Sequence, residues 1–416
     1  MDSSTSPVPR HVSESLGKVE SSIHNKMDRT SDLESGSIIE LSTHRVPDCL
    51  REVNPKAYTP QLVLIGPLHR SLKFQALKSR GDITKAKSLG YLNTEVHKKI
   101  YLVEFTKRVE GNKVVEELRR KIKEDIGIYT IDEDLIRASY SESTAWIGSS
   151  DFVEMILHDS IFIIELMLRF LVRGSERIGD PLMDELCLEN TIKRDLILLE
   201  NQLPYFILEK LFDPIIKILY HEETLRTLVI KYFQLDNKNL KKNSKFRHFT
   251  DLFRCIRVET LPDDDISYSR GVKFEAVEEE FSVWVKFDIK TGCLKIPCFS
   301  ANDDMEIELR NIMAFEQSYY PYHAYVCDYV TFLDFLIDTE KDVDLLVEKG
   351  IIKNWLGHHG AVSELVNKLC LGVVDDGSSY ANIASKVLAH YDNKCNKARS
   401  ILRACISTIC GEGQPP

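Results

Sequence analysis

Residues 198–212 read LLENQLPYFILEKLF, an almost continuous apolar run interrupted by Glu200, Asn201, Gln202 and Pro204. Proline is tolerated at the first position of a helix, where its missing amide costs nothing. We therefore expect one helix to end near Asn201 and a second to begin at Pro204. A buried backbone group left without a partner costs about 1 to 3 kcal/mol, so the three polar side chains are expected to satisfy the junction. Lining a ligand site is the alternative role for them.

Size and composition place the chain among folded globular proteins. It has 416 residues, of which 43% are hydrophobic and 28% charged, enough for more than one packed region. The formal net charge of −10 repels phosphate backbones, so nucleic acid is not expected as a partner.

Cysteine spacing and hydropathy bear on the cellular compartment. The ten cysteines include no Cys-x-x-Cys pair, which favours reduced thiols in the cytoplasm over zinc or disulfide sites. The N-terminus has no apolar core of the kind found in signal peptides. The most apolar stretch, residues 161–172, contains Glu165 and Arg169 and is shorter than the ~20 residues that cross a bilayer. We therefore expect a buried helix there and no transmembrane span.

The first two-thirds of the chain show helical periodicity. Residues 1–37 are Ser-rich and expected to form a disordered tail. Residues 38–262 are expected to be a helical region that opens with an extended, proline-rich segment, which should clamp across later elements. Within it, apolar residues recur at three- and four-residue intervals and predict an amphipathic helix: Leu92, Val96, Ile100 and Val103.

The period changes to two between residues 263 and 300. Alternating apolar residues over 281–289 predict a half-buried strand, KTGC at 290–293 a hairpin turn, and LKIP at 294–297 its partner. A third strand is expected over 271–277. Residues 301–391 are expected to be helical and packed with the first region, and 392–416 to be an amphipathic terminal segment. The predicted fold is mainly α with a small antiparallel β-sheet inserted (α+β), as a multi-helix globular protein.

The chain resembles the plant family catalogued as domain of unknown function 247. The resemblance extends from about residue 45 to 371 and rests on motifs that occur in order: HRVPDCLREVNPKAYTPQLVLIGPLH, DSIFIIELMLRFL, DLILLENQLPYFILEKLF, RHFTDLFR, FDIKTGCLKIP and RNIMAFEQ. Members are mostly uncharacterised, and some grass members are pollen-side determinants of self-incompatibility, which implies recognition of a partner. Many members carry a C-terminal membrane-spanning helix, whereas the last residues here, NKARSILRACISTICGEGQPP, contain no long apolar span.

No common catalytic signature occurs in the sequence. G-x-S-x-G, the P-loop, G-x-G-x-x-G after a strand and H-E-x-x-H are all absent, and no cofactor or metal site is predicted. The candidates for catalysis are His248 and Asp251, three apart on one predicted helix face, together with Glu165 and Glu316. Buried carboxylates need partners or raised pKa values, and Arg45, Arg51 and Arg310 are the expected structural partners. A structural role is favoured for all four candidates.

Three functional hypotheses follow. The first is a soluble recognition or interaction protein of plant cells with a protein partner, acting in signalling or reproduction. The alternative is an enzyme of plant specialised metabolism that holds a small-molecule ligand in a polar cleft on the helical core, near the four candidates. The third is peripheral membrane association through acylation of Cys405 and Cys410.

Overall fold

The computed structural model describes residues 43–70, 72, 86–109, 112–123, 133–171, 179–221, 223–235, 240, 244–258, 273–277, 282–288, 293–374, 380 and 383. The predicted tail over 1–37 and the terminal segment over 392–416, with Cys405 and Cys410, lie outside these residues. The predicted division of the chain at residues 262 and 300 stays a prediction.

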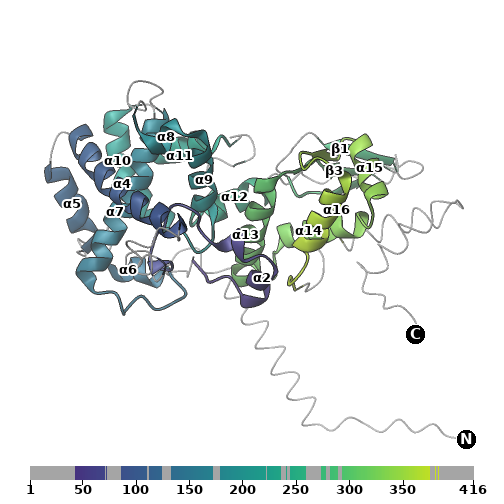
Figure 1. Ribbon diagram of the computed structural model, residues 1–416, viewed down its shortest axis with the longest axis horizontal. Helices are drawn as coiled ribbons and strands as arrows, with labels where there is room; N and C mark the ends of the chain where they lie inside the picture. The colour runs from purple at the N-terminus through teal and green to yellow at the C-terminus, as the bar shows by residue number, and fades with distance from the viewer. Residues whose placement is uncertain are drawn as a thin grey trace, which may run out of the picture. The chain divides into compact units, whose positions relative to one another are not determined.

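The first hydrophobic core forms around α7 (Ser149–Leu171). Helices α4 (Ala86–Arg108), α5 (Asn112–Lys123) and α11 (Leu225–Phe233) pack against it (Figure 1). α7 is buried over most of its length because apolar residues occupy nearly every face from Phe152 to Phe170. Among the described residues, no helix is long and apolar enough to cross a membrane. The remaining helices of this core are α6 (Glu133–Ala138), α8 (Pro181–Asp184), α9 (Leu186–Ile197) and α10 (Tyr205–Leu219).

Helix α4 buries a different face from the one its periodicity indicates. Tyr101 and Phe105 are buried against the core. Val96, Ile100 and Val103, which define the apolar period in the sequence, are 56%, 46% and 53% exposed. Because aromatic side chains bury far more apolar area than valine, the face that carries Tyr101 and Phe105 packs inward.

The junction between α9 and α10 comprises residues 198–204. α9 ends at Ile197, with Leu198 as its C-cap, and Pro204 is the N-cap of α10. The first helix therefore ends about one turn earlier than expected, and the second begins one residue later. Residues 198–201 form a turn, with a hydrogen bond from the amide of Asn201 to the carbonyl of Leu198, and the polar side chains of the junction reach several neighbouring segments.

The second core combines helices with short strands. β2 (Lys286–Asp288) pairs antiparallel with β3 (Cys293–Pro297), with Phe287 opposite Leu294. The predicted mainly helical fold with a small antiparallel sheet is thus confirmed. β1 (Lys273–Val277) joins the other edge of β3 in the parallel direction, so the three-stranded sheet is mixed. β4 (Phe299–Ala301) and β5 (Ile352–Asn354) form a separate parallel pair.

Four helices pack with these strands in the second core, and α12 joins the two groups. The four are α13 (Asp303–Tyr319), α14 (Tyr325–Leu336), α15 (Glu340–Glu348) and α16 (His359–Leu369). Helix α12 (Phe249–Val258) contacts both α9 and α13. Its apolar residues are divided between the two cores, with Phe249 in the first and Val258 in the second.

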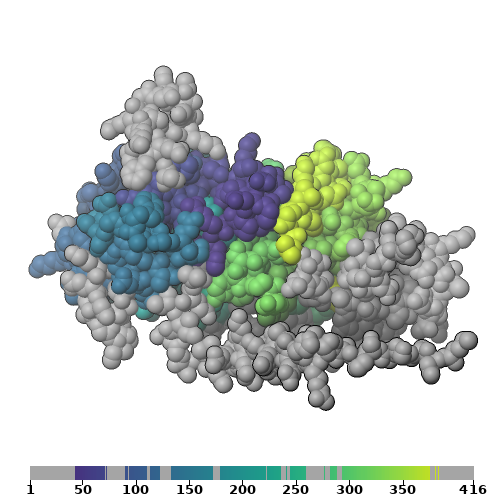
Figure 2. All heavy atoms as spheres, turned by 90° about the horizontal axis from the view of Figure 1, so that it is seen from below, coloured from purple at the N-terminus to yellow at the C-terminus, as the bar shows by residue number. Residues whose placement is uncertain are grey.

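Residues 43–70 form a strap that contacts both groups of helices. The strap contains α2 (Asp48–Val53) and the 3₁₀ turn η1 (Pro55–Tyr58). Val46, Leu50 and Tyr58 pack with Leu199 and Phe315 in a small core of their own. In Figure 2 the strap, in purple, lies between the blue helices of the first core and green α13.

Candidate functional site

The strap is held by buried side chains of α9 and the junction. The carboxylate of Asp195 accepts hydrogen bonds from the backbone amides of three consecutive strap residues, Gln61, Leu62 and Val63, at 2.7 to 2.8 Å. These amides have no strand partner, so Asp195 supplies the acceptors that a sheet would otherwise provide. Asp195 is only 1% exposed.

Asn201 and Gln202 complete the attachment. The Oδ1 atom of Asn201 accepts from the amide of Ile65 at 2.7 Å, and its Nδ2 donates to the carbonyls of Val63 and Asp195. Gln202 donates to the carbonyls of Leu196 and Leu198 and accepts from the amide of Phe249 at the start of α12. The two amide side chains thus satisfy the junction, the strap and the next helix together.

Glu200 is the charged member of the junction. Its carboxylate accepts from the backbone amide of Val46 at 2.8 Å and pairs with Arg51 at 2.5 Å and Arg45 at 3.3 Å. Arg45 also donates to Glu142 and to the carbonyl of Leu68. Arg45 and Arg51, two of the three arginines expected to pair with buried carboxylates, therefore pair with Glu200. The third, Arg310, pairs with Glu306.

A buried lysine fixes the far end of the strap. Lys98 on α4 donates to Asp159 of α7 and to Glu95, each at 2.6 Å, and to the carbonyl of Leu64. Burial lowers the pKa of Lys98, but Asp159 and Glu95 together outweigh burial and raise it. The second oxygen of Asp159 accepts from the amide of Gly66 at 2.8 Å.

A cavity of about 680 Å³ lies beside this attachment. Arg45, Arg51, His69 and Glu200 contribute to its lining, together with Val46, Pro47, Asp48, Thr59, Leu68, Leu72 and Glu142. His69 is 5% exposed, and its Nε2 atom has no hydrogen-bond partner in the described part of the chain. Burial, reinforced by the positive charges of Arg45 and Arg51, lowers the pKa of His69 from 6.5 to about 3. The ring is therefore neutral at physiological pH.

His69 gives the protein a predicted dependence of stability on pH. The unfolded chain binds a proton at His69 below pH 6.5, whereas the folded chain does so only near pH 3, so stability is lost as the pH falls through this window. Between pH 7 and pH 5 the loss due to His69 should be about 2 kcal/mol. Urea titrations at both pH values should show this loss in the wild type and a correspondingly smaller one in His69→Phe. Because Asp48, Glu142 and Glu200 are present in both proteins, the difference between the two proteins in the pH dependence of stability reports on His69. Equal pH dependence in both would contradict the prediction.

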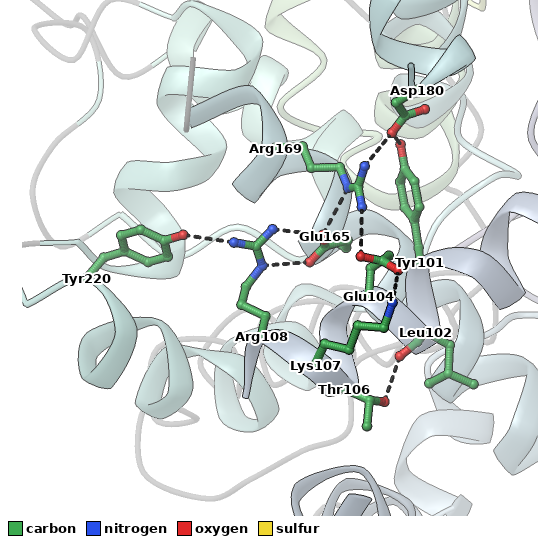
Figure 3. Close-up of polar contacts among 10 residues, drawn as sticks. All are labelled: Tyr101, Leu102, Glu104, Thr106, Lys107, Arg108, Glu165, Arg169, Asp180 and Tyr220. Carbon is green, nitrogen blue, oxygen red and sulfur yellow. Dashed lines mark hydrogen bonds and ion pairs between the residues drawn. The ribbon is translucent and has the colours of Figure 1, made fainter. Parts of the chain in front are cut away.

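Glu165, the first catalytic candidate, lies beneath a second cavity of about 610 Å³ between α4, α7 and the start of α8. Figure 3 shows its carboxylate between two guanidinium groups. Arg108 donates from Nε at 3.0 Å and from Nη2 at 2.9 Å, and Arg169 donates from Nε at 2.9 Å. Glu165 is fully buried, and its two arginine partners differ from the ones expected.

The rest of this network is also paired. Arg169 donates to Asp180 at 2.9 Å, and Tyr101 donates to the same oxygen at 2.7 Å (Figure 3). The other oxygen of Asp180 caps α8 through the amide of Leu182. Burial and then Asp180 raise the pKa of Tyr101 far above its ordinary value, so the phenol stays protonated and donates. Each described charged side chain of this network thus has a partner of opposite charge, which favours a structural role for Glu165.

Glu316 belongs to a separate cluster between α12 and α13. It pairs with Arg254 at 2.8 Å and accepts from the backbone amides of Val326 and Cys327 at the start of α14. Burial raises the pKa of Glu316 to about 7, although Arg254 and the two amides favour the ionised form. The guanidinium of Arg254 also stacks over the ring of Tyr320, 3.8 Å from its centroid.

His248 and Asp251 lie at the start of α12 in the same cluster. The backbone amide of Asp251 donates to Nδ1 of His248 at 3.2 Å. The carboxylate of Asp251 accepts from the amide of Arg247 at 2.9 Å and pairs with its guanidinium. Burial raises the pKa of Asp251, opposed by the charge of Arg247. The two side chains therefore satisfy backbone amides at the start of α12, His248 that of Asp251 and Asp251 that of Arg247.

The structure brings His248, Asp251 and Glu316 into one cluster and places Glu165 in another. Neither cavity described above is lined by any of the four. No group of three or more potential metal-ligating side chains occurs among the residues that the structure describes. Sequence reasoning missed the polar groups that hold the strap, Asp195, Asp159 and Lys98, and the buried His69. The burial of Lys98 could have been predicted from the sequence, because Lys98 lies at helical spacing from Tyr101 and Phe105, on the same face of α4.

The fold and its polar sites define a mainly helical class of protein, in which a strap is fastened to an interior junction by buried carboxylates and amides. The chain belongs to the family of plant proteins of unknown function known as domain of unknown function 247, whose sequence profile matches residues 43–269 and 267–406.

Curated relatives agree with this assignment. The chain is 26% identical over 405 residues to the UPF0481 protein At3g47200 of Arabidopsis thaliana, covering 87% of this chain and 79% of the relative. It is also 26% identical over 114 residues to the Putative UPF0481 protein At3g02645 of the same plant, covering 27% of this chain and 22% of that relative. No solved structure matches the chain.

Proposed function

We propose that the protein is a recognition protein that binds a partner protein through the exposed face of α4. The observation that carries the proposal is the apolar stripe of Val96, Ile100 and Val103, each close to half exposed. The spacing i, i+4, i+7 is the one with which a helix engages an amphipathic helix of a partner. The stripe adjoins the cavity above Glu165, to whose lining Ile100 itself contributes.

The charge around the stripe supports a protein partner more than a catalytic role. His97, Glu104 and Lys107 line the same cavity and give the apolar stripe a polar margin. An apolar centre with a polar rim is the usual anatomy of a protein interface. Beneath it, Glu165 is fully committed to ion pairs, which argues against the enzyme alternative.

The cellular setting is also a proposal. Resemblance to grass members that act in pollen recognition is the support for a role in signalling or reproduction. Cys49, Cys187, Cys327 and Cys370 are free thiols, which supports a cytoplasmic location.

Substituting the centre of the stripe tests the proposal. Ile100→Glu should abolish capture of a partner that the wild-type chain retains reproducibly from plant extract, because a charge would be buried in an apolar contact. Leu345→Glu, at a 43% exposed position on α15, is the matched control and should retain that partner. Melting temperatures should stay equal, since both positions face solvent. Identical partner sets for the wild type and both variants would contradict the proposal.

A further inference from the structure

The cavity beside the strap contains polar groups that the fold leaves unused. Arg51 donates from Nη2 to Glu200, and its other guanidinium nitrogens have no acceptor among the described residues. Its side chain is 28% exposed and lines the cavity. Arg45, in contrast, uses Nε, Nη1 and Nη2 for Glu142, Glu200 and Leu68.

His69 is the second unused group. Its imidazole lines the same cavity, is almost wholly buried, and makes no hydrogen bond through Nε2 within the described residues. A buried polar group without a partner costs about 1 to 3 kcal/mol, and folds rarely leave one unless something completes it. A neutral imidazole offers one N–H donor and one acceptor. Burial lowers the pKa of the ring, and the positive charges of Arg45 and Arg51 lower it further.

We propose that this cavity binds a small molecule with one carboxylate and an apolar body. The carboxylate would accept from the unused edge of Arg51 and from a ring N–H of His69, while Val46, Pro47 and Leu68 contact the apolar part. The inference is independent of the α4 surface.

Charge and shape favour a monocarboxylate over other ligands. A guanidinium edge matches a carboxylate in a planar, two-point contact. The carboxylate of Glu200 is already compensated by Arg45, Arg51 and the amide of Val46. A dianionic phosphate would add a charge that Glu142 and Asp48, both in the lining, would repel. The volume of about 680 Å³ is in the range of ordinary small-molecule sites.

The site is also preorganised. Two strap residues that precede His69 are fixed, Gly66 by Asp159 and Leu68 by Arg45, and Arg70, which follows it, pairs with Asp151. A ligand would therefore bind without ordering a loop, which reduces the entropic cost of binding.

Titration calorimetry with benzoate and hexanoate tests the proposal. At least one acid should bind the full-length wild-type chain with a dissociation constant at or below about 1 mM. Its amide analogue, benzamide or hexanamide, should bind at least about tenfold more weakly, because the amide carries no charge. Arg51→Lys keeps the positive charge beside Glu200 but removes the planar edge, and His69→Phe keeps the ring shape but removes the N–H. Each should weaken binding of the acid about tenfold.

Arg194→Lys is the matched control, because Arg194 forms an exposed ion pair with Asp304 away from the cavity lining. It should bind the acids as the wild type does. Circular dichroism and melting temperature at pH 7 establish that each variant is folded. The proposal is overturned if the amides bind as well as the acids, if Arg51→Lys and His69→Phe bind like the wild type, or if neither acid binds with a dissociation constant at or below about 1 mM.

Discussion

Replacing Asp195 by alanine is expected to lower the free energy of unfolding by about 3 to 6 kcal/mol. The carboxylate is the acceptor for the amides of Gln61, Leu62 and Val63. The hydrogen bonds from the amides of Gln61 and Leu62 are partly buried, and the one from Val63 is buried. Because Asp195 is only 1% exposed, alanine would leave these amides without their acceptor while the buried ones keep their desolvation penalty. The figure approaches the whole stability of an ordinary domain.

Urea denaturation followed by circular dichroism measures this effect. Asp344→Ala is the control: its side chain is 61% exposed and its ion pair with His359 lies at the surface of α15. Such a pair contributes at most about 1 kcal/mol. Asp195→Asn should fall between the wild type and Asp195→Ala, since one of its two oxygens is retained. A loss in Asp195→Ala no larger than that in Asp344→Ala would show that the strap is not held by this carboxylate.

Gly66→Ala is the second substitution with a large expected effect. Gly66 has a φ angle of +71°, a region that costs an alanine about 1 to 2 kcal/mol. An added Cβ would lie 2.6 Å from the carbonyl oxygen of Gln202, which is backbone and already accepts from the hydroxyl of Tyr140. Overpacking of this kind adds about 1 to 3 kcal/mol, for a total loss of about 2 to 5 kcal/mol.

Gly148→Ala provides the comparison for the same chemical change. No atom lies within 4 Å of a Cβ added at Gly148, and its φ angle is not positive. Its effect should stay within about 1 kcal/mol. Thermal and urea unfolding of both variants give the measurement. If the two alanine variants have the same stability, the strap and the junction are not in the close contact described.

Local patterns in the sequence predicted much of the fold. The apolar α7, the polar break between α9 and α10, and the antiparallel pair β2 and β3 each follow from residue spacing within a short window. The face that α4 buries did not follow in the same way. Valine and isoleucine on one side and tyrosine and phenylalanine on the other both repeat at helical spacing, and packing against α7 selects between them.

The polar sites were only partly accessible from the sequence. The clustering of Glu200, Asn201 and Gln202 within an apolar run marked the junction in advance. Their partners could not be named, because Val46 and Ile65 lie more than a hundred residues earlier in the chain. The pairings of Glu316 with Arg254 and of Lys98 with Asp159 were hidden for a similar reason, because the partners lie 62 and 61 residues apart.

The sequence by itself determined the family, the mainly helical class and the position of the polar junction, because these depend on spacing between near neighbours. Only the tertiary structure decided which buried groups are neutralised and which stay unused. A carboxylate such as Glu165 or a ring such as His69 takes its chemistry from charges brought close by folding. Hydrogen bonds and ion pairs form over a few ångströms, and residue numbers do not measure that distance.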